Sequence, residues 1–280
     1  MHHEISERFN ELARRSESQH GLAEGALILA AEAKPDVDIE AGLDAVADLA
    51  ERSRPLVENA ASASAAIEAL NYSLFELERF RGNHEQYEDP RNSFLDEVLA
   101  RRRGLPISLS ILYVEVARRL GFEAYGISFP GHFLAKVVGV PEAPNNEVIV
   151  DPFFGRSLSR EDCAERLRAA AGDDVSFDPD WLRPASAREI YVRMLNNLKL
   201  HYLQRVDGLA ALGCFDRILV LTPDAAPEYR DRGLLLERLD CVLPAIEDLT
   251  RFLELAPHDE QAASIRMRRD ALGQRKPVLN

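Results

Sequence analysis

The chain has 280 residues, of which 46% are hydrophobic and 29% charged, and this composition is typical of a globular protein with a proper core. Its formal net charge is −13 at pH 7. Such a surface repels phosphate groups, so we expect neither nucleic acid nor an anionic membrane as a partner. The best candidate for a local basic patch, RRR at 101–103, is more typical of a solvated helix end.

Three cysteines are present, an odd number at wide spacing, which gives no disulfide framework and no zinc pattern. We therefore expect no metal, no cofactor and a reducing compartment. The N-terminal stretch 1–15 is charged and lacks the apolar segment of a signal peptide. The longest apolar run, near 23–33, is too short to span a bilayer. The sequence thus predicts a soluble, cytoplasmic protein and leaves its oligomeric state open.

The first part of the chain is predicted to be helical. Apolar residues recur with helical spacing over 4–16, 21–33, 39–61 and 63–80. Asp38 is placed to cap the third of these helices, and Pro35 ends the second. The polar segment 80–92 holds Gly, Asn and an Asp-Pro pair, so it is expected to be a loop.

A short helix over 93–103 follows, in which Ser93 and Asp96 resemble a capping box. The next predicted helix, 105–120, is apolar on nearly every side and belongs in the middle of a domain. Gly121 ends it as a left-handed cap. A polar strip is left only by Ser108, Glu115, Arg118 and Arg119.

The hydrophobic period then changes from 3.6 residues to about 2. Residues 123–129, 132–140 and 147–153 are predicted to form three strands, and the loop 141–146 joins the last two as an antiparallel hairpin. A buried helix followed by antiparallel strands is an α+β arrangement.

The C-terminal part is predicted to be helical and repetitive. A helix over 159–172 and a linker over 178–186 precede it. Pro223 and Pro257 lie 34 residues apart within two similar segments, and this period resembles tetratricopeptide repeats, which stack to cover their apolar faces. We expect two domains, 1–180 and 185–280.

Candidate chemistry centres on His132, Asp151 and the start of helix 105–120. Free N–H groups at a helix N-terminus lower the pKa of a nucleophile and hold an oxyanion. A histidine deprotonates that nucleophile, and a carboxylate fixes the tautomer of the histidine.

Three motifs carry a family resemblance: NSFLDEVLARRRGLPISLSILYVEVARRLG, PGHFLAKV and VDPF. Over about 70–155 they resemble the transglutaminase-like superfamily, whose core is related to papain-like proteases. With the helical repeat behind them, they are similar to a bacterial branch described as regulators of invasion genes and sometimes grouped with F-box protein homologues. The resemblance implies a buried central helix, an antiparallel sheet and a Cys-His-Asp site.

The catalytic positions of the family transfer only in part. By the resemblance, His132 and Asp151 match the family histidine and aspartate. The family cysteine stands fifteen residues before the glycine of LG, and counting back from Gly121 gives Pro106, with Gly104 at the usual preceding glycine. Proline cannot act as a nucleophile but suits the first turn of a helix.

A serine could substitute for the missing thiol. At about 100° per residue, Ser108 points about 160° away from Pro106, whereas Ser110 shares the face of Pro106 about 6 Å further along the axis. Backbone N–H groups at that depth are already used inside the helix, so an oxyanion hole there would be poor. The alternative is that Ser108 satisfies first-turn N–H groups and that Ser110 is a small residue beneath the sheet.

Two interpretations of His132 and Asp151 also stay open. In the simplest hairpin register, Val140 faces Glu147 and Asp151 faces Lys136. His132 is then on the same face as Asp151 but offset by four residues, about 13 Å along an ideal strand. The pattern predicts either a Lys136–Asp151 ion pair or, if a skewed loop or a bulge closes the offset of about 13 Å, a retained His132–Asp151 pair.

Other candidate binding residues are Pro106, Asn71, Tyr72 and Asn92. The asparagines and the tyrosine are polar groups beside apolar runs, and such residues often act as caps or core hydrogen-bonding groups. Cys163 lies in a predicted helix and after the aspartate, so we expect a small core residue.

Our first hypothesis is a non-catalytic, regulatory protein-binding module that holds a peptide segment of a partner in its helical repeats or in the former catalytic cleft. The alternative is an amide-bond hydrolase or acyltransferase with Ser110 or Ser108 as nucleophile, His132 as base and Asp151 as its orienting group. A third possibility is a purely structural protein.

Overall fold

The computed structural model describes residues 2–15, 21–172 and 175–274. They belong to two compact units, Met1–Met194 and Leu195–Asn280, which we call the first and second units. The first unit combines helices with a small antiparallel sheet, and the second contains helices. The fold is therefore α+β with a helical C-terminal part, as predicted.

Four helices open the first unit: α1 (His2–Arg14), α2 (Leu22–Ala33), α3 (Ile39–Glu58) and α4 (Ala63–Asn71). The Asp38 side chain caps α3, as predicted, and accepts a hydrogen bond from the Ala41 N–H at 3.0 Å. The α2 helix ends at Ala33, two residues before Pro35.

The helix predicted over 63–80 changes its winding halfway. After α4 comes a π-helix, η2 (Tyr72–Leu77), and the Glu78 N–H donates to the Ser73 carbonyl five residues back at 2.9 Å. Arg79 then adopts a φ of 61°. The spacing of apolar residues could not predict this change, because a π-turn has one more residue per hydrogen-bonded turn than an α-helix and leaves the apolar residues in the sequence unchanged.

The segment before the central helix holds two short strands that the sequence did not predict. β1 (Arg81–Gly82) pairs in parallel with β2 (Arg103–Gly104), and the 3₁₀-helix η3 (Pro90–Ser93) and α5 (Leu95–Arg101) lie between them in the chain. The expected capping box was wrong, because α5 begins after Phe94. Asp96 instead binds Lys34, with Nζ 2.5 Å from Oδ2.

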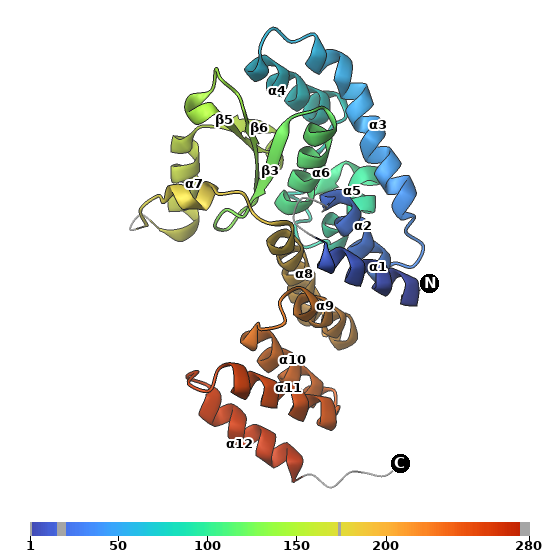
Figure 1. The fold of residues 1–280 in the computed structure, drawn as a ribbon, viewed down its shortest axis with the longest axis vertical. Helices are drawn as coiled ribbons and strands as arrows, with labels where there is room; N and C mark the ends of the chain where they lie inside the picture. The colour runs from blue at the N-terminus through green and yellow to red at the C-terminus, as the bar shows by residue number, and fades with distance from the viewer. Residues whose placement is uncertain (1, 16–20, 173–174, 275–280) are drawn as a thin grey trace. The chain divides into compact units, whose positions relative to one another are not determined.

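The predicted central helix is α6 (Pro106–Arg119), buried from Pro106 to Ala117. It lies between the N-terminal helices α2 and α3 and the sheet (Figure 1). The expected polar strip is narrower than predicted, because Ser108 and Glu115 are buried. Gly121 follows the helix with a φ of 91°.

The sheet contains four antiparallel strands in chain order: β3 (Glu123–Ile127), β4 (Leu134–Val138), β5 (Glu147–Asp151) and β6 (Arg156–Leu158). The first three were predicted, whereas β6 was not. A 3₁₀-turn, η4 (Pro144–Asn146), lies in the loop between β4 and β5.

The first unit continues with α7 (Arg160–Ala171), the 3₁₀-helix η5 (Pro179–Leu182) and the start of α8 (Ala187–Gln204). The α7 residues Cys163 and Leu167 share a core cluster with Ile127 and Phe129. Burial raises the pKa of the Cys163 thiol to about 11. Cys163 is thus a small core residue, as predicted.

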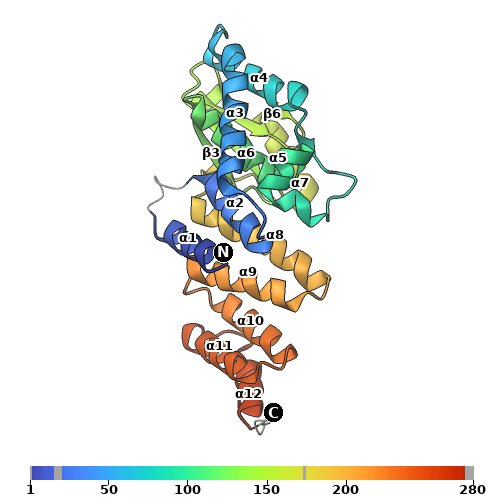
Figure 2. The same ribbon diagram turned by 90° about the vertical axis from the view of Figure 1, so that its right-hand side faces the viewer.

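The second unit contains α9 (Gly208–Leu221), α10 (Ala226–Arg238), α11 (Val242–Leu255) and α12 (Ala262–Gly273), and α9 to α12 stack one on the next (Figure 2). Val206 and Asp240 have φ values of 60° and 59° in equivalent turns, 34 residues apart. The predicted repeat period is therefore visible in the backbone. Within the described ranges, the helices are too short or too polar to cross a membrane.

Candidate functional site

His132 and Asp151 form a hydrogen-bonded pair in the first unit. The Nε2 atom of His132 lies 3.0 Å from Oδ1 and 3.1 Å from Oδ2 of Asp151. The Asp151 side chain is fully buried, and that of His132 is 10% exposed. Because a carboxylate only accepts hydrogen bonds, it favours a proton on Nε2 and leaves Nδ1 of a neutral imidazole free to accept one.

The hairpin register explains how the two residues meet. Ala135 pairs with Val150 and Lys136 with Ile149, so the predicted register was wrong by two residues. Continued by the same register, Asp151 is opposite Leu134, and the offset from His132 is two residues rather than four. A shift of two keeps each side chain on its predicted face.

The loop between β4 and β5 causes this shift. β4 ends at Val138, and Gly139, Asn145 and Asn146 adopt φ values of 75°, 58° and 58°. Left-handed backbone of this kind suits glycine and asparagine and lets the chain turn earlier than an ideal hairpin with the loop 141–146. The predicted Lys136–Asp151 ion pair was therefore wrong.

Asp151 is held by more than the imidazole. Its Oδ1 accepts hydrogen bonds from the N–H groups of Phe153 at 3.0 Å and Phe154 at 3.3 Å. Nη2 of Arg166, on α7, lies 2.7 Å from Oδ2. A buried carboxylate needs such partners to offset its lost hydration. The sequence carried no local signal for Arg166, which is fifteen residues away in the chain.

A second arginine holds the loop that carries His132. Arg193, on α8, donates to the carbonyl of His132 at 2.9 Å, to the carbonyl of Phe129 at 3.2 Å and to the Ser128 hydroxyl at 2.8 Å. Burial lowers the pKa of the Arg193 guanidinium. Sequence reasoning also missed this residue, because the contact joins positions about sixty residues apart.

The Ser108 hydroxyl is engaged at the start of α6. It accepts a hydrogen bond from the Leu105 N–H at 3.0 Å and lies 2.7 Å from the Asn92 carbonyl, to which it donates. A second acceptor, the Leu105 carbonyl, is 3.1 Å away. Ser108 thus satisfies backbone groups at the helix entrance, which is the structural alternative expected from the sequence.

Ser110 and Pro106 complete the buried face of α6. The Ser110 hydroxyl lies 3.4 Å from the Phe133 carbonyl, beneath the sheet, and is fully buried. Pro106 is the first residue of α6, after the N-cap Leu105. The structure thus brings His132 and Asp151 together and gives both serine hydroxyls backbone partners.

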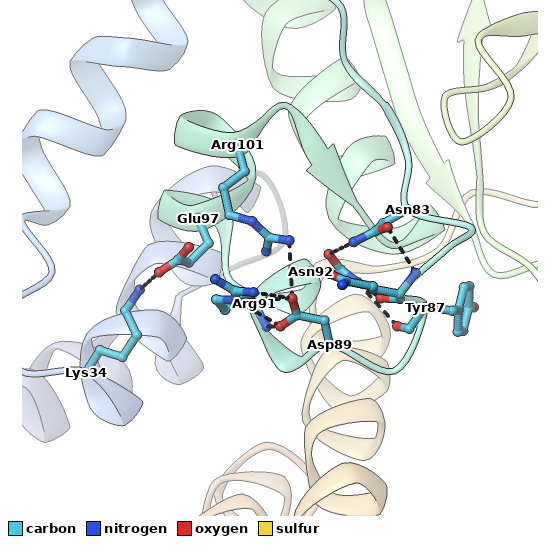
Figure 3. A network of polar contacts seen from close by, with 9 residues as sticks. Lys34, Asn83, Tyr87, Asp89, Arg91, Asn92, Glu97 and Arg101 are labelled. Carbon is cyan, nitrogen blue, oxygen red and sulfur yellow. Dashed lines mark hydrogen bonds and ion pairs between the residues drawn. The ribbon is translucent and has the colours of Figure 1, made fainter.

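Asn92 organises the loop before α6 (Figure 3). It is fully buried, and its Nδ2 donates to the carbonyls of Gln86 at 2.7 Å and Tyr87 at 3.3 Å. Its Oδ1 accepts a hydrogen bond from Asn83 at 3.0 Å. Because its own carbonyl accepts from Ser108, Asn92 fixes the loop to the start of the central helix.

Asp89 adds a charged contact to the same loop. Its carboxylate lies 2.8 Å from Arg91 and 3.2 Å from Arg101 (Figure 3). The hydrogen bonds from Arg91 hold the pKa of Asp89 below its usual value. The RRR segment therefore contributes to ion pairs as well as to the end of α5.

Asn71 and Tyr72 occupy different environments from the His132–Asp151 pair. The Asn71 Oδ1 accepts a hydrogen bond from the Tyr113 hydroxyl at 2.9 Å, and its Nδ2 donates to the Ser157 hydroxyl at 3.1 Å. Tyr72 is 52% exposed. Asn71 thus connects α4 with α6 and β6.

Aromatic rings border the imidazole. The ring centroids of Phe153 and Phe154 lie 5.9 Å and 6.1 Å from that of His132. His84, from the loop after β1, contacts the same two rings at 4.4 Å and 5.1 Å. No group of three or more metal-ligating side chains occurs among the residues that the structure describes.

Two families match the chain. A model of the transglutaminase-like superfamily matches residues 38–196, and a model of the tetratricopeptide repeat matches residues 198–270. Both resemblances seen in the sequence are thereby confirmed. No solved structure matches the chain.

Several bacterial proteins are similar over most of the chain. A "UPF0162 protein" of Xylella fastidiosa (strain 9a5c) is 38% identical over 262 residues, which cover 92% of each chain. A "UPF0162 protein" of Vibrio cholerae is 32% identical over 90% of this chain and 92% of its own. "Protein SirB1" of Salmonella typhimurium is 26% identical over 67% of this chain and 68% of its own.

Proposed function

Because the chain belongs to the UPF0162 family of transglutaminase-like proteins but carries Pro106 at the position expected for the thiol, we propose that it is a non-catalytic, regulatory protein-binding module. In this proposal residues 1–180 form the N-terminal helical segment with the transglutaminase-like part, residues 185–280 form the repeats, and either the repeats or the former catalytic cleft holds a peptide segment of a partner protein. Tetratricopeptide repeats generally mediate such contacts.

The strongest support comes from the start of α6. Pro106 offers neither a nucleophilic atom nor an N–H group at the first helical position. A site of the papain type needs a nucleophile there, because the free N–H groups of the first turn hold the oxyanion. Without that nucleophile, the His132–Asp151 pair has no attacking group at the helix end.

The two serines do not replace the missing group in this proposal. The Ser108 hydroxyl donates to a backbone carbonyl at 2.7 Å, and the Ser110 hydroxyl faces another at 3.4 Å. A general base must lie within about 3 Å of the proton that it removes. For catalysis, either hydroxyl would have to leave its partner and turn to the imidazole.

The alternative function, an amide-bond hydrolase or acyltransferase, is favoured by one observation. His132 and Asp151 have the 3.0 Å contact that a Ser-His-Asp arrangement requires. In a binding module the same contact has a structural role, because the imidazole gives a fully buried carboxylate a hydrogen-bond donor. The three cysteines form no disulfide with one another, which is consistent with the reducing, cytoplasmic location that we also propose.

Selection of a displayed random-peptide library on the immobilised full-length chain tests the proposal. We expect enrichment of a common motif, equal enrichment by the Ser108→Ala and Ser110→Ala variants, and recovery of intact peptides by mass spectrometry. Recovery of cleaved or acylated peptides from the wild type but not from His132→Ala would establish the enzyme instead. Failure to enrich any motif over a blank surface would contradict peptide binding.

A further inference from the structure

A groove of about 550 Å³ lies beside the His132–Asp151 pair. Its floor includes Phe153 and Phe154, whose rings also border the imidazole. This volume is within the roughly 300–1,000 Å³ that is typical of ligand sites. The other lining residues come mostly from η2, β1 and the segments next to them, and they include Phe75, Glu76, Arg79, Arg81 and His84.

Two arginines give one side of the groove a positive charge. Arg79 and Arg81 are exposed, and neither has an ion-pair partner among the described residues. Glu78, which lies near them in the chain, instead forms ion pairs with Arg52 at 2.6 Å and with Arg102 at 3.4 Å. Glu76 is the one carboxylate among the lining residues that the structure gives for this groove.

The backbone beside these arginines has an uncommon conformation. The π-helix η2 ends at Leu77, and Arg79 follows with a φ of 61°. π-Turns occur frequently at functional sites, and a left-handed non-glycine residue stores strain that the surrounding structure must offset. Both features place side chains in the groove, since η2 supplies Phe75 and the turn supplies Arg79.

Aromatic rings supply the apolar side of the groove. Phe154 is 50% exposed, and its ring lies 5.3 Å from that of the buried Phe153. The guanidinium of Arg166 lies over the Phe154 ring, 4.8 Å from its centroid. Because Arg166 is itself held by its ion pair with Asp151, this contact helps to fix the Phe154 ring. An exposed aromatic ring held in this way offers a rigid surface to an apolar side chain.

We propose that this Arg79–Arg81 groove binds an acidic segment of a partner protein. A carboxylate of the segment pairs with the two guanidinium groups, and a neighbouring apolar side chain lies on Phe154. Guanidinium groups bind carboxylates through directed, charge-assisted hydrogen bonds. Phosphate sites commonly add the N–H groups of a helix N-terminus, and none of the residues that line the groove begins a helix, so a carboxylate is the better match.

This proposal rests on the peptide-binding function and adds the chemistry of the partner. The net negative charge of the chain opposes binding of an acidic peptide, so binding at the groove should depend on its two arginines. Removal of either arginine should therefore have a large effect. Arg119 provides a matched control, because it is an exposed arginine of the same unit that does not line the groove.

Fluorescence anisotropy with the full-length chain tests the proposal. The probe is a fluorescein-labelled peptide, Ser-Glu-Phe-Asp-Leu-Glu-Gly, and the comparison peptide replaces each Glu and Asp by Gln and Asn. We expect binding of the acidic peptide only, weakened about 10-fold by Arg79→Gln or by Arg81→Gln, which corresponds to about 1.4 kcal/mol each. Phe154→Ala should also weaken it, whereas Arg119→Gln should leave it unchanged.

Four results would overturn the assignment: no binding of the acidic peptide at about 1 mM protein, equal binding of the two peptides, equal effects of Arg79→Gln and Arg119→Gln, or displacement by inorganic phosphate at matched ionic strength. Equal binding of the two peptides would leave the peptide-binding function intact and reject only the acidic chemistry. Cleavage of the probe, detected by mass spectrometry, would instead reject the non-catalytic function. Melting curves of each variant identify any loss of folding.

Discussion

Lys136 pairs with Glu147 across the β4–β5 hairpin, with Nζ 2.8 Å from Oε2, and this contact leaves Asp151 to His132. Both partners are largely buried, with side chains 8% and 13% exposed. The hairpin register therefore decides which acid meets the lysine and which meets the histidine.

A double-mutant cycle of Lys136→Met and Glu147→Gln should give a coupling free energy of about 1–2 kcal/mol in urea unfolding, because the pair is shielded from water. The same cycle with Lys136→Met and Asp151→Asn should give less than about 0.5 kcal/mol. Larger coupling to Asp151 than to Glu147 would show that the hairpin has the other register.

The contribution of Glu147 to the free energy of unfolding should depend on pH. Burial raises the pKa of Glu147, but the hydrogen bonds from Lys136 and Arg160 outweigh burial and hold it below its usual value. The Glu147 carboxylate therefore binds a proton more readily in the unfolded chain than in the folded one. The stabilisation that Glu147 provides is thus fully present above about pH 4.3, the unfolded pKa, and is lost as the pH falls below that value. Urea unfolding of the wild type and Glu147→Gln between pH 3 and 7 checks this, and a constant difference would contradict it.

Asp151→Asn should lower the free energy of unfolding by about 3 kcal/mol, because it leaves the buried Arg166 contact without a negative charge. Replacing both partners, as Asp151→Asn with Arg166→Met, should recover part of that loss, since paired removal leaves no isolated charge. The exposed Asp180→Asn provides the control. A double variant less stable than Asp151→Asn alone would contradict the assigned ion pair.

Ser108→Ala and Ser110→Ala should differ in stability. The Ser108 hydroxyl satisfies two buried backbone groups, so its loss should cost about 1–2 kcal/mol. The 3.4 Å contact of Ser110 is weak, so its loss should cost less than about 1 kcal/mol. Chemical denaturation of the two variants measures both values, and the reverse order would mean that Ser110 has the stronger partner.

The elements that local patterns specify were predicted well. The apolar residues of α6, the Asp38 cap and the 34-residue repeat are all encoded by neighbours in the chain, and the structure contains each of them. The pairing of His132 with Asp151 followed from the side-chain parity of strands together with the family resemblance. The catalytic or binding roles of these residues stay predictions.

Features that depend on distant contacts or on single backbone angles were missed. Arg166 and Arg193 reach the site from helices far along the chain, and a sequence pattern does not record such pairs. The hairpin register depends on the left-handed Gly139 and Asn145, which an ideal strand model ignores. The π-turn of η2 left no trace in the apolar spacing.

The central claim is that the start of α6 supplies no activated nucleophile to His132. The most direct measurement is the intact mass of the full-length chain after incubation with a fluorophosphonate, which labels activated serines without the need for a known substrate. We predict no adduct on the wild type, under conditions in which a serine esterase is fully labelled. One adduct on the wild type that disappears in His132→Ala and in Ser108→Ala or Ser110→Ala would contradict the account.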